Sequence, residues 1–250
     1  MKIFFDHIYG NTTTFDLIYS LALAEVSDGE EESALDKGWT PVDSYFYPLT
    51  DLIWINSRTT RINIENFTWR KKYRRLKKND VTFKFFLKGE PMPYIQECER
   101  VYKYYCKLKK YDDHSDQLYD HDFKDNDYVV YFYKNKIIAY SSFKRFENSV
   151  VAGEFAWDYE MPELNMGYFC VNVECEYYSR MGLKYYYNPF AYQLVCDYKS
   201  HFDKFEWWTG REWSADKKIF RNLLENDSAT NNLEDLDKNT QKFYTLKEQK

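Results

Sequence analysis

KYYYNPFAYQLVCDYKSHFDKFEWWTGREW, residues 184–213, is the stretch of the chain that says most about its fold. Three consecutive tyrosines, Tyr185–Tyr187, predict a strand, and the aromatic run 205–213 predicts a second one. So many aromatic side chains around few ionisable groups indicate the wall of a pocket or groove, because aromatics give contact area at low entropic cost. The alternative is a core strand followed by a surface loop packed by its aromatics. This stretch alone does not separate the two.

The composition bounds what the rest of the chain can be. At 250 residues with 44% hydrophobic side chains it can form one large domain or two small lobes, each with a real core. The five cysteines are odd in number and form no Cys-x-x-Cys pair, so we expect buried free thiols in a reducing cytosol. The four histidines are scattered, and we predict no metal site. We see no signal peptide and no apolar run that could span a membrane, and expect a soluble cytoplasmic protein.

Charge is distributed unevenly along the chain. The net charge is -5, which by itself disfavours general affinity for nucleic acid. Residues 58–78, which we call the basic segment, nevertheless hold nine basic residues against one acidic residue, Glu65. A concentrated basic segment on an acidic chain predicts a local anionic partner, and a phosphate backbone would relieve its self-repulsion. The cations form a charge field without a spaced set of base readers, so we expect phosphate contacts with little sequence readout.

Hydrophobic periodicity and turn residues predict a mixture of helices and strands. We expect strands over 2–9, 45–47, 52–64, 81–87, 128–133, 137–143, 150–159 and 184–187, and helices over 13–26, 30–37, 67–79, 92–110, 166–180 and 216–226. Lys134-Asn135 is predicted to be the tight turn of a hairpin.

The order of these elements predicts an α+β fold with a repeated theme, because each half runs helix, antiparallel strands, helix, strand. We expect a first lobe over 1–112 that carries the basic segment, a crossover over 113–127, a second lobe over 128–213, and a C-terminal extension over 214–250 that is partly flexible. A cleft between the lobes is expected to hold Asp158 and Tyr187.

Two further motifs carry chemistry. In the strand Glu154-Phe155-Ala156-Trp157-Asp158-Tyr159, alternation places Glu154 and Asp158 on one face, where a carboxylate pair can serve acid–base chemistry or simply be solvated. Tyr198-Lys199 offers a lysine among aromatics, which suits an anion or a ribose hydroxyl. The chain has no P-loop, GxSxG or GxGxxG motif, and no pyrophosphate-binding turn precedes the helix predicted at Met166.

In this order the motifs resemble the tRNA-dependent aminoacyl transferases: the arginyl- and leucyl-tRNA–protein transferases and the Fem-type transferases. The resemblance covers about residues 30 to 213, and small size with an AT-rich bias would suit a virus-encoded member acting in the host cytoplasm. The chain lacks the N-terminal cysteine cluster of the eukaryotic members, and Asn188-Pro189 replaces a leucine-glycine pair. The matching motifs are Arg61-Ile62 with Phe67 and Arg70–Lys78; Trp157-Asp158-Tyr159 with Leu164-Asn165-Met166-Gly167; Tyr185–Tyr192; and Cys196-Asp197-Tyr198-Lys199 with Phe202 and Trp213.

The resemblance implies a double fold of the Gcn5-related N-acetyltransferase (GNAT) kind and the transfer of an amino acid from charged tRNA to the amine of a peptide or protein. The ester is already activated, so no cofactor and no metal are implied, and aminoacyl-tRNA is a co-substrate. We expect a monomer that binds the acceptor stem mainly through phosphates, and no membrane partner. The implied catalytic residues are Asp158, Tyr187 and Lys199; the substrate-binding residues are Glu154, Trp157, Asn188 and Tyr198; the RNA-binding residues are Arg58, Arg61, Arg70, Lys71, Arg74, Arg75, Lys77 and Lys78.

Two other functions stay open from the sequence. One is an acyl-CoA-dependent N-acyltransferase of the same fold, which the missing pyrophosphate turn disfavours. The other is a non-catalytic protein that binds RNA or a peptide.

Overall fold

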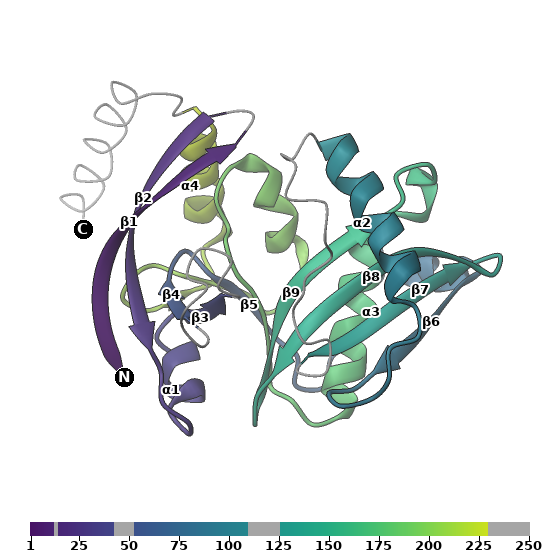
Figure 1. The fold of residues 1–250 in the computed structure, drawn as a ribbon, viewed down its shortest axis with the longest axis horizontal. Helices are drawn as coiled ribbons and strands as arrows, with labels where there is room; N and C mark the ends of the chain where they lie inside the picture. The colour runs from purple at the N-terminus through teal and green to yellow at the C-terminus, as the bar shows by residue number, and fades with distance from the viewer. Residues whose placement is uncertain (13–14, 43–52, 110–125, 230–250) are drawn as a thin grey trace.

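A computed structural model describes residues 1–12, 15–42, 53–109 and 126–229 of the chain. The fold is α+β, as the sequence predicts (Figure 1). None of the helices in these ranges is both long and apolar enough to span a bilayer. The elements are β1 Lys2–Thr12, β2 Phe15–Glu25, α1 Glu31–Leu35, β3 Trp39–Val42, β4 Ile53–Asn56, β5 Thr60–Asn63, η1 Arg74–Lys78, β6 Val81–Phe86, α2 Ile95–Lys109, β7 Asp127–Tyr133, β8 Lys136–Arg145, β9 Ser149–Trp157, η4 Pro162–Leu164, α3 Met166–Arg180, β10 Tyr185–Asn188, η5 Leu194–His201, β11 Phe205–Trp208, β12 Trp213–Ser214 and α4 Lys217–Ser228, where η marks a 3-10 helix.

Two sheets organise the described part of the chain. The larger sheet has eight strands in the order β12-β11-β5-β10-β9-β8-β7-β6, and the smaller has four in the order β1-β2-β4-β3. All neighbours in the larger sheet are antiparallel except β9 and β10, which helix α3 connects. The predicted hairpin is confirmed as β7 and β8, and both residues of its turn, Lys134 and Asn135, have positive φ. Asparagine tolerates that conformation and such turns suit the twist of a hairpin.

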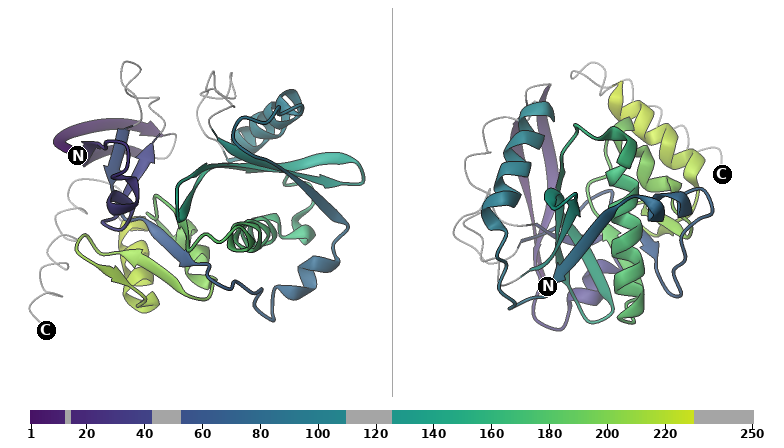
Figure 2. Two further views of the ribbon diagram at one scale, coloured as in Figure 1. Left: turned by 90° about the horizontal axis from the view of Figure 1, so that it is seen from below. Right: turned by 90° about the vertical axis from the view of Figure 1, so that its right-hand side faces the viewer.

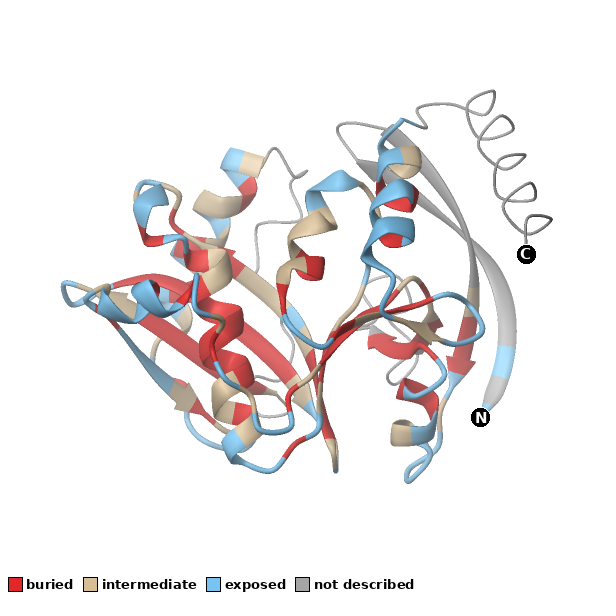
Figure 3. Cartoon of the chain, turned by 180° about the vertical axis from the view of Figure 1, so that it is seen from behind, coloured by how far each residue is buried: buried red, intermediate tan, exposed pale blue. Residues whose placement is uncertain are grey.

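Helices cover both faces of the larger sheet (Figures 1 and 2). Helix α2 packs on one face through Cys98 and Val101, against Tyr128 and Tyr140 of the strands. Helix α3 lies on the opposite face and is buried along most of its length, as the view from behind shows (Figure 3). Helix α3 therefore forms the centre of the core.

The connection from β5 to β6 wraps around the outer side of α3 (Figure 2, left). Within it Trp69 packs edge-to-face on Phe169 at a centroid distance of 5.9 Å, and Tyr73 stacks on Tyr168 at 4.8 Å. The predicted helix over 67–79 is wrong in extent, because only Arg74–Lys78 is helical and as a 3-10 turn. The apolar residues of this stretch are buried as predicted, but turns rather than an α-helix place them.

Strands β9 and β10 diverge. They pair only where Tyr185–Tyr187 face Ser149–Val151, while β9 continues to Trp157. The register between β8 and β9 also shifts, with Ser141 opposite Phe155 and Phe143 opposite Ala152. The two strands therefore leave an opening next to an irregular stretch of β9, which is where β-bulges place functional groups in other sheets.

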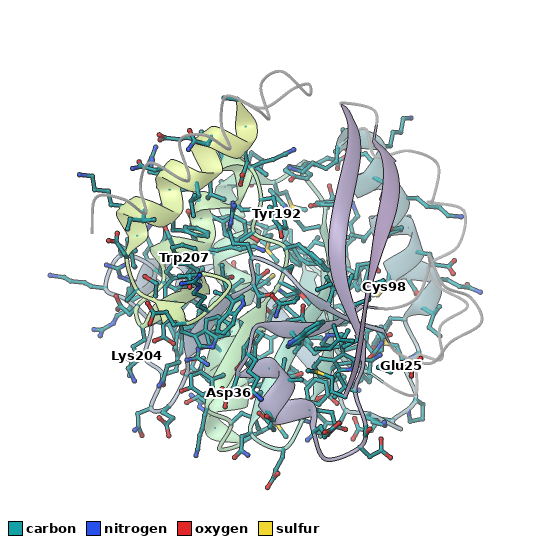
Figure 4. The ribbon with its side chains drawn as sticks, turned by 90° about the vertical axis from the view of Figure 1, so that its left-hand side faces the viewer. Glu25, Asp36, Cys98, Tyr192, Lys204 and Trp207 are labelled. Atoms are coloured by element: carbon teal, nitrogen blue, oxygen red, sulfur yellow. The ribbon has the colours of Figure 1, made fainter. Side chains whose placement is uncertain are left out.

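The expected first lobe over 1–112 is divided between the two sheets, because β1–β4 form the smaller sheet while β5 and β6 belong to the larger one. Strand β5 inserts between β10 and β11, and β6 forms the far edge beside β7. The division expected at 113–127 therefore does not coincide with a boundary between sheets. Helix α4, which belongs to the expected extension, packs on β11 through Phe220 against Phe205 and Trp207. Trp207 is labelled below this helix in Figure 4.

Two sequence predictions near the N-terminus are corrected. The helix predicted over 13–26 is strand β2 over its described residues 15–25, paired with β1 along its whole length. The single strand predicted over 52–64 is two strands, β4 and β5, which belong to different sheets. The strand predicted over 45–47, and most of the expected crossover, lie outside the described residues.

Candidate functional site

A cavity of about 520 Å³ opens where β9 and β10 diverge. Its walls come from β8, β9 and β10, the first three turns of α3, the η5 segment and the end of α2. A cavity of this size can hold a small molecule or the end of a polymer. The residues that line it include Glu154, Trp157, Asn165, Met166, Gly167, Tyr168, Glu174, Tyr186, Asn188, Tyr198 and Lys199.

Glu174 of helix α3 is a buried acidic group in this lining. Its Oε1 accepts hydrogen bonds from Tyr131 Oη at 2.9 Å and Ser141 Oγ at 2.7 Å, and its Oε2 accepts one from Tyr186 Oη at 2.8 Å. Burial raises the pKa of Glu174, and the three hydroxyl donors oppose that rise. The three donors fix the position of the carboxylate and join β7, β8 and β10 to α3.

Lys199 of η5 is a buried cation in the opposite wall. Its Nζ donates to the carbonyl oxygen of Pro189 at 2.7 Å and lies 3.5 Å and 3.4 Å from those of Asn188 and Phe190. Burial lowers its pKa from 10.5 to about 8. At neutral pH the side chain is therefore mostly an ammonium ion, held by the turn that follows β10.

The neighbouring Tyr198 is also fixed. It is bonded to the side chain of Asn188, and burial raises the pKa of its hydroxyl to a value well above 10. Tyr198 is thus a neutral hydroxyl group that lines the same cavity as the Lys199 ammonium. Such a pair can stabilise negative charge that develops on an oxygen.

The start of helix α3 faces the cavity. Asn165 precedes the helix with φ 50° and makes no side-chain cap, and Met166 and Gly167 form the first turn. A Cβ placed on Gly167 would meet nothing within 4 Å, so the space next to it is open. Backbone N–H groups at a helix start favour an anion.

Five of the seven residues predicted to act in catalysis or substrate binding come together in this cavity: Glu154, Trp157, Asn188, Tyr198 and Lys199. The other two, Asp158 and Tyr187, are not part of its lining. Asp158 is buried and paired with Lys136 at 3.1 Å. Tyr187 packs on the other face of the sheet, with its Oη 3.4 Å from Arg61 Nη1.

The fold pairs more of the cations in the basic segment than the sequence suggests. Four of them have acidic partners from distant parts of the chain. Arg58 pairs with Asp227, Arg61 with Glu206 and Asp36, Arg70 with Asp203, and Lys77 with Glu176. Arg61 is moreover buried between the rings of Tyr185 and Trp213, 4.2 Å and 4.0 Å from their centroids. Arg58 and Arg61, predicted to bind RNA, thus act as structural links here.

The remainder of the basic segment is exposed. Lys71, Lys72, Arg74, Arg75 and Lys78 form no ion pair within the described residues. Arg70 donates to the carbonyl of His201, whose ring bonds the cavity residue Tyr168. The basic segment is therefore linked to the cavity lining through Arg70 and His201.

Sequence reasoning missed Glu174, Tyr168 and His201. Glu174 carried a detectable signal, because it is an acidic residue between apolar neighbours on a helix, in the run Cys170–Cys175. Such a group is costly to bury without partners, so its position predicts a polar network. Tyr168 and His201 are 33 positions apart, and only the fold shows that they meet.

No family model and no curated protein sequence matches the chain. Among solved structures, the chain is similar to L-PGS from Bacillus licheniformis, at 14% identity and a TM-score of 0.44 over 66% of this chain and 52% of that one.

Two further structures show similarity at a comparable level. The C-terminal domain (DUF2156) of an Agrobacterium fabrum protein described as a lysylphosphatidylglycerol synthetase is 12% identical, with a TM-score of 0.46 over 78% of this chain and 62% of that one. An aminoglycoside acetyltransferase from an uncultured soil metagenomic sample is 13% identical, with a TM-score of 0.38 over 48% of this chain and 83% of that one. The chain thus spans about half to two thirds of the length of the first two proteins.

Proposed function

We propose that this protein is an acyltransferase that moves the aminoacyl group of a charged tRNA to the amine of a peptide or protein. The observation that carries the proposal is the cavity between β9 and β10, with a buried ammonium ion in its wall. The exposed cations of the basic segment support it, since Arg70 of that segment is linked through His201 to the cavity residue Tyr168. We expect the cavity to hold the terminal adenosine and its amino acid, and the exposed cations to contact phosphates of the same strand.

The attack on the ester depends on positioning and charge stabilisation by the protein. The amine attacks the carbonyl carbon of the ester, and a negative charge develops on the carbonyl oxygen. Lys199 and Tyr198 supply an ammonium ion and a hydroxyl group to the same cavity, which suits that charge. Holding amine and ester together supplies a further part of the rate.

Asp158 and Tyr187 take different roles in this proposal from those that the resemblance implied. Asp158 holds the end of β9 through Lys136 and through the backbone N–H of Glu160 at 3.1 Å. Tyr187 supports Arg61 on the far face of the sheet. Both therefore position the cavity walls without touching the reacting atoms.

The exposed cations Lys71, Lys72, Arg74, Arg75 and Lys78 would bind the acceptor stem through its phosphates. No ion pair within the described residues fixes the direction of these side chains. We therefore expect them to bind RNA phosphates without a strong preference among tRNA sequences.

An acyl-CoA donor is the second candidate, and one observation favours it. The first turn of α3 lines the cavity with open space beside Gly167, so its N–H groups can receive a phosphate. The glycine-rich turn that usually accompanies such a phosphate site is absent before Met166. Acyl-CoA therefore stays an alternative donor to be tested in parallel.

The test is incubation of the purified chain with total charged tRNA and a pool of peptides, followed by mass spectrometry for added residues. Acetyl-CoA with the same peptides is the parallel arm. Added amino acids support the proposal, acetylated peptides support the alternative, and no modified peptide in either arm leaves a binding protein as the better account.

A binding measurement tests the role of the basic segment separately. We expect Arg74→Glu with Arg75→Glu to weaken tRNA binding at least tenfold, and equally for different tRNAs, with a shallower salt dependence. Arg211→Glu with Lys218→Glu is the matched control, since both residues are exposed and the change in net charge is the same. Equal affinity of the two double variants would contradict RNA binding by the basic segment.

A further inference from the structure

Tyr168, His201 and Asp197 form a chain of polar groups that begins in the cavity. The Tyr168 hydroxyl lies 2.7 Å from His201 Nδ1, and His201 Nε2 lies 3.5 Å from Asp197 Oδ2. Tyr168 lines the cavity, and its ring meets that of Tyr198 edge-to-face at a centroid distance of 6.4 Å. A hydroxyl, an imidazole and a carboxylate in this order can pass protons to and from whatever the cavity holds.

We propose that Tyr168 is a catalytic residue that shuttles a proton from the attacking amine to the leaving alcohol, with His201 and Asp197 positioned to accept and return it. This inference rests on the proposed acyl transfer. The inference assigns the two proton transfers of the reaction. The attacking amine must lose a proton and the leaving ribose oxygen must gain one, and a single group can serve both.

The geometry serves both halves of the reaction. While His201 is neutral, its Nδ1 accepts the proton of the Tyr168 hydroxyl. The Tyr168 oxygen then takes a proton from the amine as the new carbon–nitrogen bond forms and the carbonyl electron pair moves onto oxygen. The His201 imidazolium that results lies beside the Asp197 carboxylate.

The second half runs in reverse. The electron pair on oxygen restores the carbonyl, and the carbon–oxygen bond to the ribose breaks. The ribose oxygen takes the Tyr168 proton, and the imidazolium returns its proton to Tyr168. Ester and amine become amide and alcohol, and the three side chains end as they began.

The surroundings of the three groups fit this use. Stacking on Tyr73 fixes the Tyr168 ring, and the η5 turn fixes His201 four residues after Asp197. Burial raises the pKa of the Tyr168 hydroxyl, so it is a neutral proton carrier at physiological pH. Tyr168 replaces the single carboxylate base that the sequence suggested.

Charged side chains hold both members of the His201–Asp197 pair. Asp197 Oδ2 lies 3.5 Å from His201 Nε2, and Arg221 Nη1 lies 3.4 Å from the same carboxylate oxygen. Arg70 donates to the carbonyl of His201 and pairs with Asp203. These contacts keep the imidazole and the carboxylate next to each other.

The first arm of the test needs no activity. In the full-length chain labelled at histidine, the His201 NMR signal is identified by its loss in His201→Gln and titrated with pH. Tyr168→Phe removes a hydrogen bond while keeping the stacked ring, and should move the titration midpoint by about 0.4–1 pH unit. Tyr177→Phe, which removes another hydroxyl from α3 outside the cavity lining, should not move it. An unmoved midpoint in Tyr168→Phe overturns the inference.

The second arm measures transfer with the donor that the native protein accepts. We expect Tyr168→Phe to lower kcat about 100-fold with KM nearly unchanged, and His201→Gln to lower kcat and flatten its pH dependence. Full kcat in Tyr168→Phe overturns the inference while the proposed function stands. Absence of transfer by the native protein overturns the proposed function and the catalytic role together, while the first arm still reports whether the hydrogen bond exists.

Discussion

Replacing Lys199 with methionine tests the electrostatics of the cavity wall directly. Burial lowers the pKa of Lys199 from 10.5 to about 8, so the folded protein releases a proton that the unfolded chain still holds at pH 9. Stability rises with pH wherever the unfolded state binds more protons. The buried Lys199 ammonium therefore lowers the stability of the fold at low pH, and this penalty decreases as pH rises through the folded pKa towards the unfolded one.

The magnitude follows from the same relation. Between pH 7 and pH 9 the native protein should gain roughly 1.3 kcal/mol in free energy of unfolding relative to Lys199→Met, in which this titration is absent. Methionine matches the volume of the lysine stem, so the folded cavity wall is preserved.

The assay is urea unfolding of both proteins at several pH values, with the exposed Lys71→Met as the control. The control should follow the native curve over this range. Parallel curves for the native protein and Lys199→Met would refute the depressed pKa. If the free energy of unfolding of the native protein fell relative to that of Lys199→Met as pH rises, the pKa of Lys199 would be raised and not lowered.

Three other substitutions test the packing and the polar network. Gly38→Ala should destabilise the fold by about 2–5 kcal/mol, because Gly38 has φ +75° and an added Cβ would lie 2.3 Å from the Trp208 ring. Gly89→Ala, with φ +85° and open space around it, should cost only about 1–2 kcal/mol, and equal losses in urea unfolding would contradict the contact at Gly38. Glu174→Leu leaves three hydroxyl donors without their acceptor and should lower the free energy of unfolding by more than about 3 kcal/mol, whereas a variant as stable as the native protein would show that the network contributes nothing.

The sequence predicted the second half of the fold well, because its patterns there are local. Helix α3 has the predicted bounds, Met166–Arg180, and the Lys134-Asn135 turn joins the two strands expected around it. Hydrophobic periodicity and turn residues act over a few positions, so they survive in a single sequence.

The wrong prediction of a helix over 13–26 has a physical cause. The sequence FDLIYSLALAE of β2 is rich in leucine and alanine, which favour a helix in isolation. Pairing with β1 and β4 overrides that preference. Pairing of this kind depends on distant strands and leaves no local pattern to read.

The sequence predicts only part of the site, because it shows local runs of residues but not contacts between distant ones. Trp157, Tyr198 and Lys199 were identified because they stand in distinctive local runs, and they do meet in one cavity. The bond between Tyr168 and His201, and the acidic partners of the basic segment, join residues too far apart for spacing to indicate. The charge count along the sequence therefore overestimates the number of unpaired cations in the basic segment.

The insertion of β5 between β10 and β11 has a consequence for synthesis on the ribosome. About 120 residues separate β5 from β10, its first partner strand in the chain. At a synthesis rate of roughly 5–20 residues per second, β10 is made roughly 6–24 s after β5. During that time the nascent chain exposes two unpaired strand edges, and Ile62 has no core to enter. We expect the growing chain to depend on the ribosome or on chaperones until β11 has emerged, and a chain stopped before Phe205 to aggregate rather than fold.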